Sequence, residues 1–327
     1  MTEITRVSFP SVKRSCASWG HLSGEFRPRP ARRAPRAALR AHAGARRARP
    51  YPGRMSQPTT VADVLERAAR AAGHPRLTWY GPDGARIELS GSVLANWVTK
   101  TVNLLVEELD AGPGTRVLLD LPPHWRTVPW ALAAWRTGAC VVLPGDGGRA
   151  HDGAGRADVG PVDVVVTDRP AAHPAPGRPV VVAVTLASLA RRFDGELPAG
   201  AVDAAAAVMT YGDALGWVPD VDPAAPALES AGARVPHAGL VARARAATAA
   251  AAGGRALEGA RALLTVDGGR AVPGPASDVG AVLDHVLTLL AADGSLVLLD
   301  PGAAPDTDRP ARRARVTADE RVTLDLG

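Results

Sequence analysis

The chain has 327 residues, of which 46% are hydrophobic and only 4% are aromatic. This length allows one large domain or two modest domains, with cores built mainly from Val, Leu and Ala. No apolar run approaches the length needed to cross a bilayer, so the composition argues against a membrane-spanning protein and predicts a soluble one.

The net charge of +5 is unevenly distributed. Residues 1–54 contain thirteen Lys and Arg but only two acids, Glu3 and Glu25, so this segment carries +11 and residues 55–327 carry −6. The high isoelectric point therefore belongs to the leader. It gives no reason to read the folded part as a nucleic-acid-binding protein.

The leader is rich in Arg and Pro, and its stretch 27–36 has no periodic apolar face, which predicts disorder. Three interpretations remain open: an organelle transit peptide, a basic arm for nucleic acid, or residues upstream of a true start at Met55. We favour a start at Met55, because a helix signal follows it directly. The 36 Arg against 2 Lys also suggest a GC-rich genome.

The two cysteines, Cys16 and Cys140, are isolated in the sequence. Cys140 lies in the apolar run 139–143, which predicts a buried thiol that behaves as a small hydrophobic side chain. Two such cysteines form neither a disulfide framework nor a zinc site. We therefore expect a reducing, cytoplasmic compartment.

From Met55 onward, apolar strands alternate with amphipathic helices. The predicted helices, with apolar residues at helical spacing and with Thr59 or Thr60, Ser90 and Ser277 as caps, span 61–72, 90–109, 124–137, 186–193, 240–252 and 277–292. The predicted strands span 77–80, 87–89, 116–121, 139–143, 162–167, 179–184, 262–266, 296–300 and 321–326. Continuous apolar strands separated by such helices predict an α/β fold with mostly parallel sheets covered on both faces.

The stretch 145–160 is rich in Gly and Asp and is predicted to be a loop. Its glycines lack the G-x-G-x-x-G spacing, and nothing places Asp146 and Asp152 opposite a substrate. The chain also lacks the G-x-S-x-G, H-E-x-x-H, C-x-x-C and Walker lysine motifs. We therefore assign no catalytic residue and no metal site from the sequence.

Several segments of the first half resemble, in order and spacing, the opening of adenylate-forming enzymes, the superfamily of AMP-binding acyl-CoA synthetases, luciferase-like ligases and peptide-synthetase adenylation domains. These segments are Ile87-Glu88-Leu89-Ser90, Gly112-Pro113-Gly114-Thr115-Arg116-Val117, Leu121-Pro122-Pro123-His124, Arg136-Thr137-Gly138-Ala139, Leu143-Pro144-Gly145-Asp146 and Val164-Val165-Val166-Thr167-Asp168. The resemblance implies the fold of the N-terminal domain of that family: two stacked α/β subdomains, which we place at 55–200 and 201–327.

Three later segments extend the resemblance to roughly residue 300. Asp222-Pro223-Ala224 resembles the D-P-A before the family's phosphate loop, 236–241 resembles the helix start after it, and 289–297 resembles a later L-x-x-G-G-x-V-V element. The family loop itself is rich in Ser, Thr and Gly and ends in P-K-G, and its backbone N–H groups and hydroxyls hold the ATP phosphates.

The corresponding run here, Pro226–Val235, departs from that pattern. It retains one Ser and one Gly, lacks the Lys, and carries Glu229 where phosphates would bind. The remnant binding residues implied by the resemblance are Ser230, Gly232, Arg234 and His237. ATP or AMP with Mg²⁺ is expected as a cofactor only if this remnant still binds.

The printed sequence also stops where the family continues into its adenine and magnesium motifs and its C-terminal lid, and no Lys follows Lys100. Losing one preorganised charge-stabilising group typically costs a factor of about 10²–10³ in rate. We therefore predict a catalytically degenerate relative that binds a small ligand, such as a carboxylate, or a protein partner. The alternative is an acyl- or aryl-adenylate-forming ligase whose lid comes from another chain.

Two further histidines have structural and functional interpretations. His124 follows a predicted strand end, where α/β sheets often bind ligands, so it is a candidate pocket residue as well as a helix-start residue without chemistry. His285 lies within an apolar helix and is predicted to be structural.

Overall fold

The computed structural model describes residues 57–82, 84–144, 159–173, 179–230, 232–266, 278–302 and 307–327. The chain divides into two units, Met1–Arg54 and Met55–Gly327, and every described residue lies in the second. The predicted leader, Cys16, Asp146 and Asp152 lie outside the described residues. No helix of the described part is long and apolar enough to span a membrane.

Five strands form the first sheet, here called sheet A, in the order β12-β10-β11-β1-β2. All neighbours are parallel except β1 and β2, which form an antiparallel pair at one edge. The strands are β1 (Pro75–Tyr80), β2 (Arg86–Ser90), β10 (Arg261–Thr265), β11 (Ser295–Leu299) and β12 (Leu324–Asp325).

Seven strands form sheet B, in the order β7-β6-β5-β3-β4-β8-β9. It is parallel throughout except for the edge pair β8 and β9. The strands are β3 (Arg116–Asp120), β4 (Cys140–Val142), β5 (Val164–Thr167), β6 (Val180–Ala183), β7 (Val202–Asp203), β8 (Pro226–Ser230) and β9 (Ala233–Pro236). The mostly parallel α/β fold predicted from the apolar strands is confirmed.

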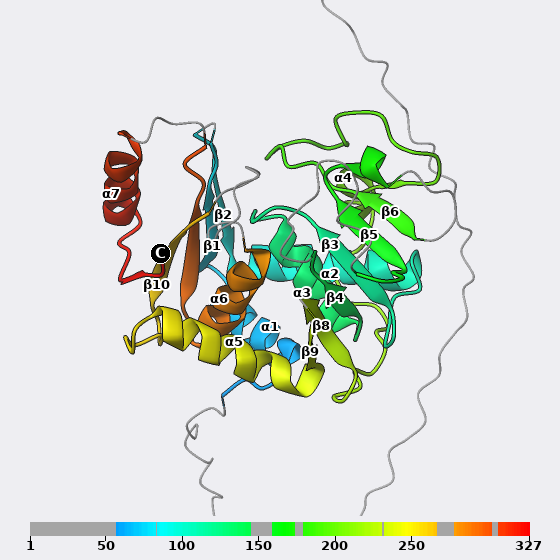
Figure 1. The fold of residues 1–327 in the computed structure, drawn as a ribbon, viewed down its shortest axis with the longest axis horizontal. Helices are drawn as coiled ribbons and strands as arrows, with labels where there is room; N and C mark the ends of the chain where they lie inside the picture. Colours follow the sequence, from blue (N-terminus) through cyan, green and yellow to red (C-terminus); the bar gives the residue numbers. More distant parts are fainter. Residues whose placement is uncertain are drawn as a thin grey trace, which may run out of the picture. The chain divides into compact units, whose positions relative to one another are not determined.

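A layer of helices lies between the two sheets (Figure 1). Its members contact one another and both sheets: α2 and α6 touch β1 and β11 of sheet A, and α3 and α5 touch strands of sheet B. These helices are α1 (Val61–Arg70), α2 (Gly91–Glu107), α3 (Thr127–Arg136), α5 (His237–Ala251) and α6 (Val279–Ala291). One continuous hydrophobic core therefore joins the inner faces of both sheets.

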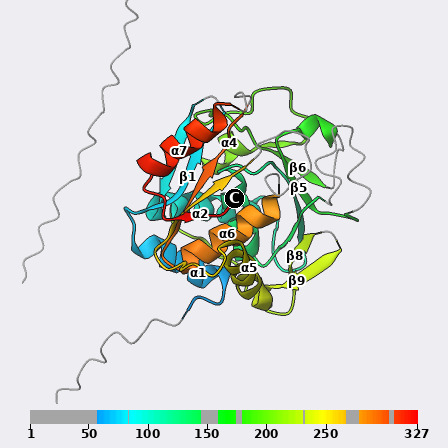
Figure 2. The same cartoon turned by 60° about the vertical axis from the view of Figure 1, so that its left-hand side comes forward.

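Helix α7 (Arg309–Asp319) packs against the outer face of sheet A, as two views show (Figure 1 and Figure 2). Its buried residue Val316 joins Leu263, Val297 and Leu299, whereas the alternate residues of the same strands point into the central core. Burial on both faces explains why these strands are continuously apolar in sequence.

Local capping chemistry sets the starts of the first two helices. Thr60 and Asp63 form a capping box at α1, and the Ser90 hydroxyl accepts a hydrogen bond from the backbone N–H of Val93 at α2. Both caps were predicted from the sequence. The cap of α6 is Asp278, one residue after the predicted Ser277, which lies outside the described residues.

Other predictions need correction. Residues 186–193 form turns and bends rather than a helix, and Leu189 is 89% exposed, so this segment has no buried apolar face to stabilise one. The run Pro226–Val235, read as an altered loop, is a β-hairpin. Helix α7 was missed because Val316 is its one buried residue.

The predicted division at residue 200 does not coincide with the two sheets. Strands β1 and β2 pair with strands from the end of the chain, and β8 and β9 complete the sheet that begins at β3. The physical reason is a long-range pairing: β1, from the start of the fold, pairs in parallel with β11, from the end of the chain, and β2 extends sheet A beyond β1.

Candidate functional site

The β8–β9 hairpin occupies the place where the resemblance puts the phosphate loop. Ser230 of β8 pairs with Ala233 of β9, so only two residues, 231 and 232, connect the strands. Gly232 has φ +77°, which favours glycine in this tight turn. A two-residue connection offers few backbone N–H groups to a phosphate chain.

Glu229 is ion-paired with two arginines. Its Oε2 accepts a hydrogen bond from Nη2 of Arg116 in β3, and its Oε1 lies 2.9 Å from Nη2 of Arg234. Arg234 thus pairs with a carboxylate while its side chain stays 67% exposed. The pairing neutralises the cation that the resemblance suggested for phosphate.

His237 begins α5 and is buried. Its Nε2 lies 3.2 Å from the carbonyl oxygen of Gly138, to which it donates. Burial lowers the pKa of His237, although the Gly138 carbonyl opposes the shift. The structure therefore directs this predicted site residue toward the turn after α3.

A buried polar cluster lies at the carboxyl ends of β3 and β5. From β3 the chain passes to β4 on one side and later returns to β5 on the other, so the strand order reverses here. Such a reversal is where open α/β sheets usually bind ligands. Asp120, the last residue of β3, is 3% exposed and belongs to this cluster.

Asp120 is held by three side chains. Its Oδ2 accepts a hydrogen bond from Thr167 Oγ1 at 2.8 Å and lies 3.1 Å from His173 Nε2, while Arg169 Nη2 donates to Oδ1 at 3.0 Å. The second ring nitrogen of His173, Nδ1, is buried without a hydrogen-bond partner. This arrangement orients an imidazole by a carboxylate, as in general-base sites.

The loop after β3 carries His124, Trp125 and Arg126, all buried. The His124 ring packs edge-on against Trp79 of sheet A, with centroids 4.6 Å apart. Burial first, and then the charge of Arg126, lower the pKa of His124 to about 3. His124 is therefore a neutral residue between the two sheets.

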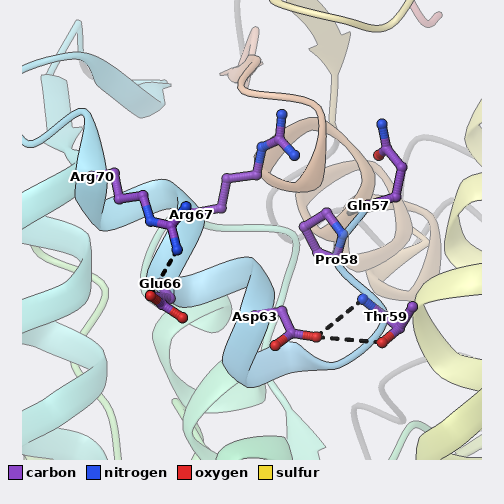
Figure 3. A pocket seen from close by; sticks show the side chains of 7 residues that line it. All are labelled: Gln57, Pro58, Thr59, Asp63, Glu66, Arg67 and Arg70. Atoms are coloured by element: carbon purple, nitrogen blue, oxygen red, sulfur yellow. Dashed lines mark hydrogen bonds and ion pairs between the residues drawn. The ribbon is translucent and has the colours of Figure 1, made fainter. Parts of the chain in front are cut away.

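A surface hollow of about 430 Å³ opens beside the start of α1 (Figure 3). Its charged side chains interact with one another or with nearby groups: Asp63 accepts a hydrogen bond from the backbone N–H of Thr60 in the capping box, Glu66 pairs with Arg70 at 2.8 Å, and Arg67 pairs with Asp293 at 2.7 Å. These contacts stabilise the first turns of α1. The residues that line the hollow are not arranged for catalysis. Within the described ranges, no group of three or more His, Cys, Asp or Glu is placed to hold a metal ion.

The remaining residues considered in the sequence analysis, Cys140 and His285, are buried inside the fold. Cys140 is a buried free thiol, as predicted, and burial followed by the charge of Glu229 raises its pKa to about 11. His285 is also buried, and its Nδ1 lies 3.0 Å from Thr248 Oγ1 of α5. Sequence reasoning missed Asp120, whose signal was a charged residue at the end of an apolar strand, and Arg126, for which the sequence carries no local signal.

Sequence comparison identifies a relative that matches most of this chain. A "TIGR03089 family protein" from Mycobacterium tuberculosis (strain ATCC 25618 / H37Rv) is 37% identical over 278 residues, which are 82% of this chain and 99% of the relative. The chain belongs to the TIGR03089 family. No protein-family model matches it.

Solved structures show that this TIGR03089 family member has the fold of the N-terminal domain of adenylate-forming enzymes. An acyl-CoA synthetase from Brucella canis matches 81% of the chain with a TM-score of 0.59 and 19% identity. A fatty acyl-adenylate ligase from L. pneumophila, solved with acyl adenylate and pyrophosphate, matches 82% with a TM-score of 0.54 and 14% identity. The chain spans 46% and 44% of these two proteins, respectively, which is about half of their length.

Proposed function

We propose that this protein is a catalytically degenerate member of the adenylate-forming fold that binds a small ligand or a protein partner without forming adenylates itself. The observation that supports the proposal is the β8–β9 hairpin, which lies where the resemblance puts the phosphate loop and whose strands stay paired as far as Ser230 and Ala233. Glu229 places a negative charge beside this turn, and Arg234 is engaged by that charge. A nucleotide would have to displace this ion pair and would find no lysine there.

An ATP–pyrophosphate exchange assay with a panel of carboxylic acids tests the proposal, with an active acyl-CoA synthetase as the positive control. We expect no exchange above the background of a heat-denatured sample. Robust exchange by the purified chain would contradict the degenerate interpretation, because exchange requires reversible adenylate formation.

The alternative is an acyl or aryl ligase completed by a second chain. Its support is the shared fold, because solved ligases such as the fatty acyl-adenylate ligase contain the same domain. This alternative predicts that ATP with Mg²⁺ binds and raises the melting temperature. Saturation at a hundred times the Kd would add about 2.7 kcal/mol to the free energy of unfolding. An unchanged melting temperature at millimolar ATP favours the degenerate protein.

A further inference from the structure

The loop between β3 and α3 contains a buried positive charge without a buried counter-charge. Arg126 is 7% exposed, and its Nη2 donates to the carbonyl oxygens of Ala187 and Ser188 at 3.1 and 3.2 Å. Among the described residues, no carboxylate forms an ion pair with it. Burying a guanidinium in this way is costly unless an anion compensates the charge.

Two donors in this loop are unsatisfied. Arg126 Nε and Trp125 Nε1 are both buried without a hydrogen-bond partner, and Trp125 is 2% exposed. The two side chains are in contact, since the guanidinium carbon lies 4.4 Å from the Trp125 ring centroid. Buried polar groups are nearly always paired, so two orphan donors on contacting side chains indicate a missing acceptor.

His124 adds no charge to the loop. The backbone N–H of Arg126 donates to His124 Nδ1 at 3.2 Å, so the neutral ring carries its proton on Nε2. The loop then leads into α3, which starts without a side-chain cap and without an acid in its first turn. The positive end of that helix dipole is therefore also uncompensated.

We propose that the loop His124–Arg126 is a binding site for a singly charged oxyanion, which accepts hydrogen bonds from Arg126 Nε and Trp125 Nε1. The charge follows from the loop itself, because Arg126 is its one cation and His124 is neutral. A monoanion cancels that charge, whereas a dianion would leave one negative charge buried. The site is separate from the β8–β9 hairpin and does not depend on nucleotide binding.

Carboxylates and phosphodiesters both present a singly charged oxyanion, and titrations of the full-length ¹⁵N-labelled chain distinguish them. The probes are acetate, dimethyl phosphate and sulfate at constant ionic strength, followed through the indole N–H resonance of Trp125, which Trp125→Phe assigns. We expect a saturable shift with acetate or dimethyl phosphate, and the probe that binds more tightly identifies the source. Absence of a shift with both, or tighter binding of sulfate, overturns the proposal.

Variants test the role of the guanidinium. Arg126→Gln is expected to weaken binding about tenfold or more, because hydrogen bonds to charged groups are the strong ones. Arg136→Gln, at the other end of α3, is the matched control and should bind as the original chain does. If Arg126→Gln does not fold, Arg126→Lys keeps the charge but loses Nε, and unchanged affinity in that variant contradicts the site.

Discussion

Glu229 lies directly opposite Arg234 in the register of the β8–β9 hairpin, with 2.9 Å between Oε1 and Nη2. Its other carboxylate oxygen binds Arg116 of β3, which lies two strands away in sheet B. One carboxylate therefore fixes the hairpin to the middle of the sheet. The same contact occupies the position in which the resemblance expects phosphates.

Removing this carboxylate should destabilise the fold more than removing its exposed partner. Glu229→Gln leaves the partly buried Arg116 without its carboxylate, and we expect a loss of about 1–3 kcal/mol in the free energy of unfolding. Arg234→Gln should cost less than about 1 kcal/mol, because that arginine is 67% exposed. Urea denaturation measures the free energy of unfolding of both variants. Equal losses would contradict the prediction that Glu229 stabilises the fold more than Arg234 does.

Asp120→Asn should destabilise the protein strongly. The carboxylate is buried and held by Thr167, Arg169 and His173, so its removal breaks a buried charged network, which typically costs about 3–5 kcal/mol. Asp220→Asn, at an exposed position, is the control and should be nearly neutral. Chemical denaturation of both variants checks the prediction. An unchanged free energy of unfolding for Asp120→Asn would show that the buried cluster does not stabilise the fold.

Stability should fall in acid because of Glu320. Burial alone would raise its pKa, but hydrogen bonds from Arg86, Tyr80 and Arg261 lower the pKa from 4.5 to about 2. A lowered folded-state pKa stabilises the protein above the unfolded-state pKa, and this contribution is lost as the pH falls from 4.5 towards 2.

The measurement is the free energy of unfolding across that pH window. Glu320→Gln should be less stable than the original chain at neutral pH and should lose less stability on acidification. Glu258→Gln is the control, since Glu258 is 64% exposed. Parallel pH profiles for the original chain and Glu320→Gln would contradict the assigned role.

Cys140 should not react with thiol reagents in the folded protein. Its side chain is buried and its pKa is raised to about 11, so the reactive thiolate is scarce at neutral pH. In a Cys16→Ser background, we expect labelling to follow the rate of unfolding when urea is added. Rapid labelling without denaturant would show that the structure around Cys140 opens readily.

A chain that begins at Met55 should be as stable as the full chain. The compact unit Met55–Gly327 contains every described element of both sheets. We expect the same urea midpoint for the two forms, while mass spectrometry of the native protein identifies the N-terminus present in the cell. A lower midpoint for the shorter form would show that residues 1–54 support the fold.

The sequence predicted the helices and strands whose signals are local. Thr60 and Ser90 cap as predicted, and apolar runs such as 116–121 and 296–300 locate strands to within one or two residues. Pairing across the sequence was not predictable, because apolar strands buried on both faces carry no information about which neighbour they take. The two sheets therefore do not follow the division at residue 200.

The candidate site was predicted only in outline. The sequence placed Ser230, Gly232 and Arg234 in one loop, but hairpin formation depends on the pairing of β8 with β4, a contact between distant segments. The buried state of Arg126 could not be anticipated either. It results from Trp97 and Trp125, whose rings lie 5.7 and 4.4 Å from its guanidinium carbon.

The position of β1 between β2 and β11 has a consequence for the order of folding. During synthesis, β1 and β2 leave the ribosome long before β10 and β11 exist, and a lone two-stranded hairpin is at best marginally stable in water. Leu77 and Trp79 must then stay exposed or be shielded until the last third of the chain arrives. Because contacts of such sequence separation form slowly, nascent chains that stall before β11 should be strong clients of chaperones.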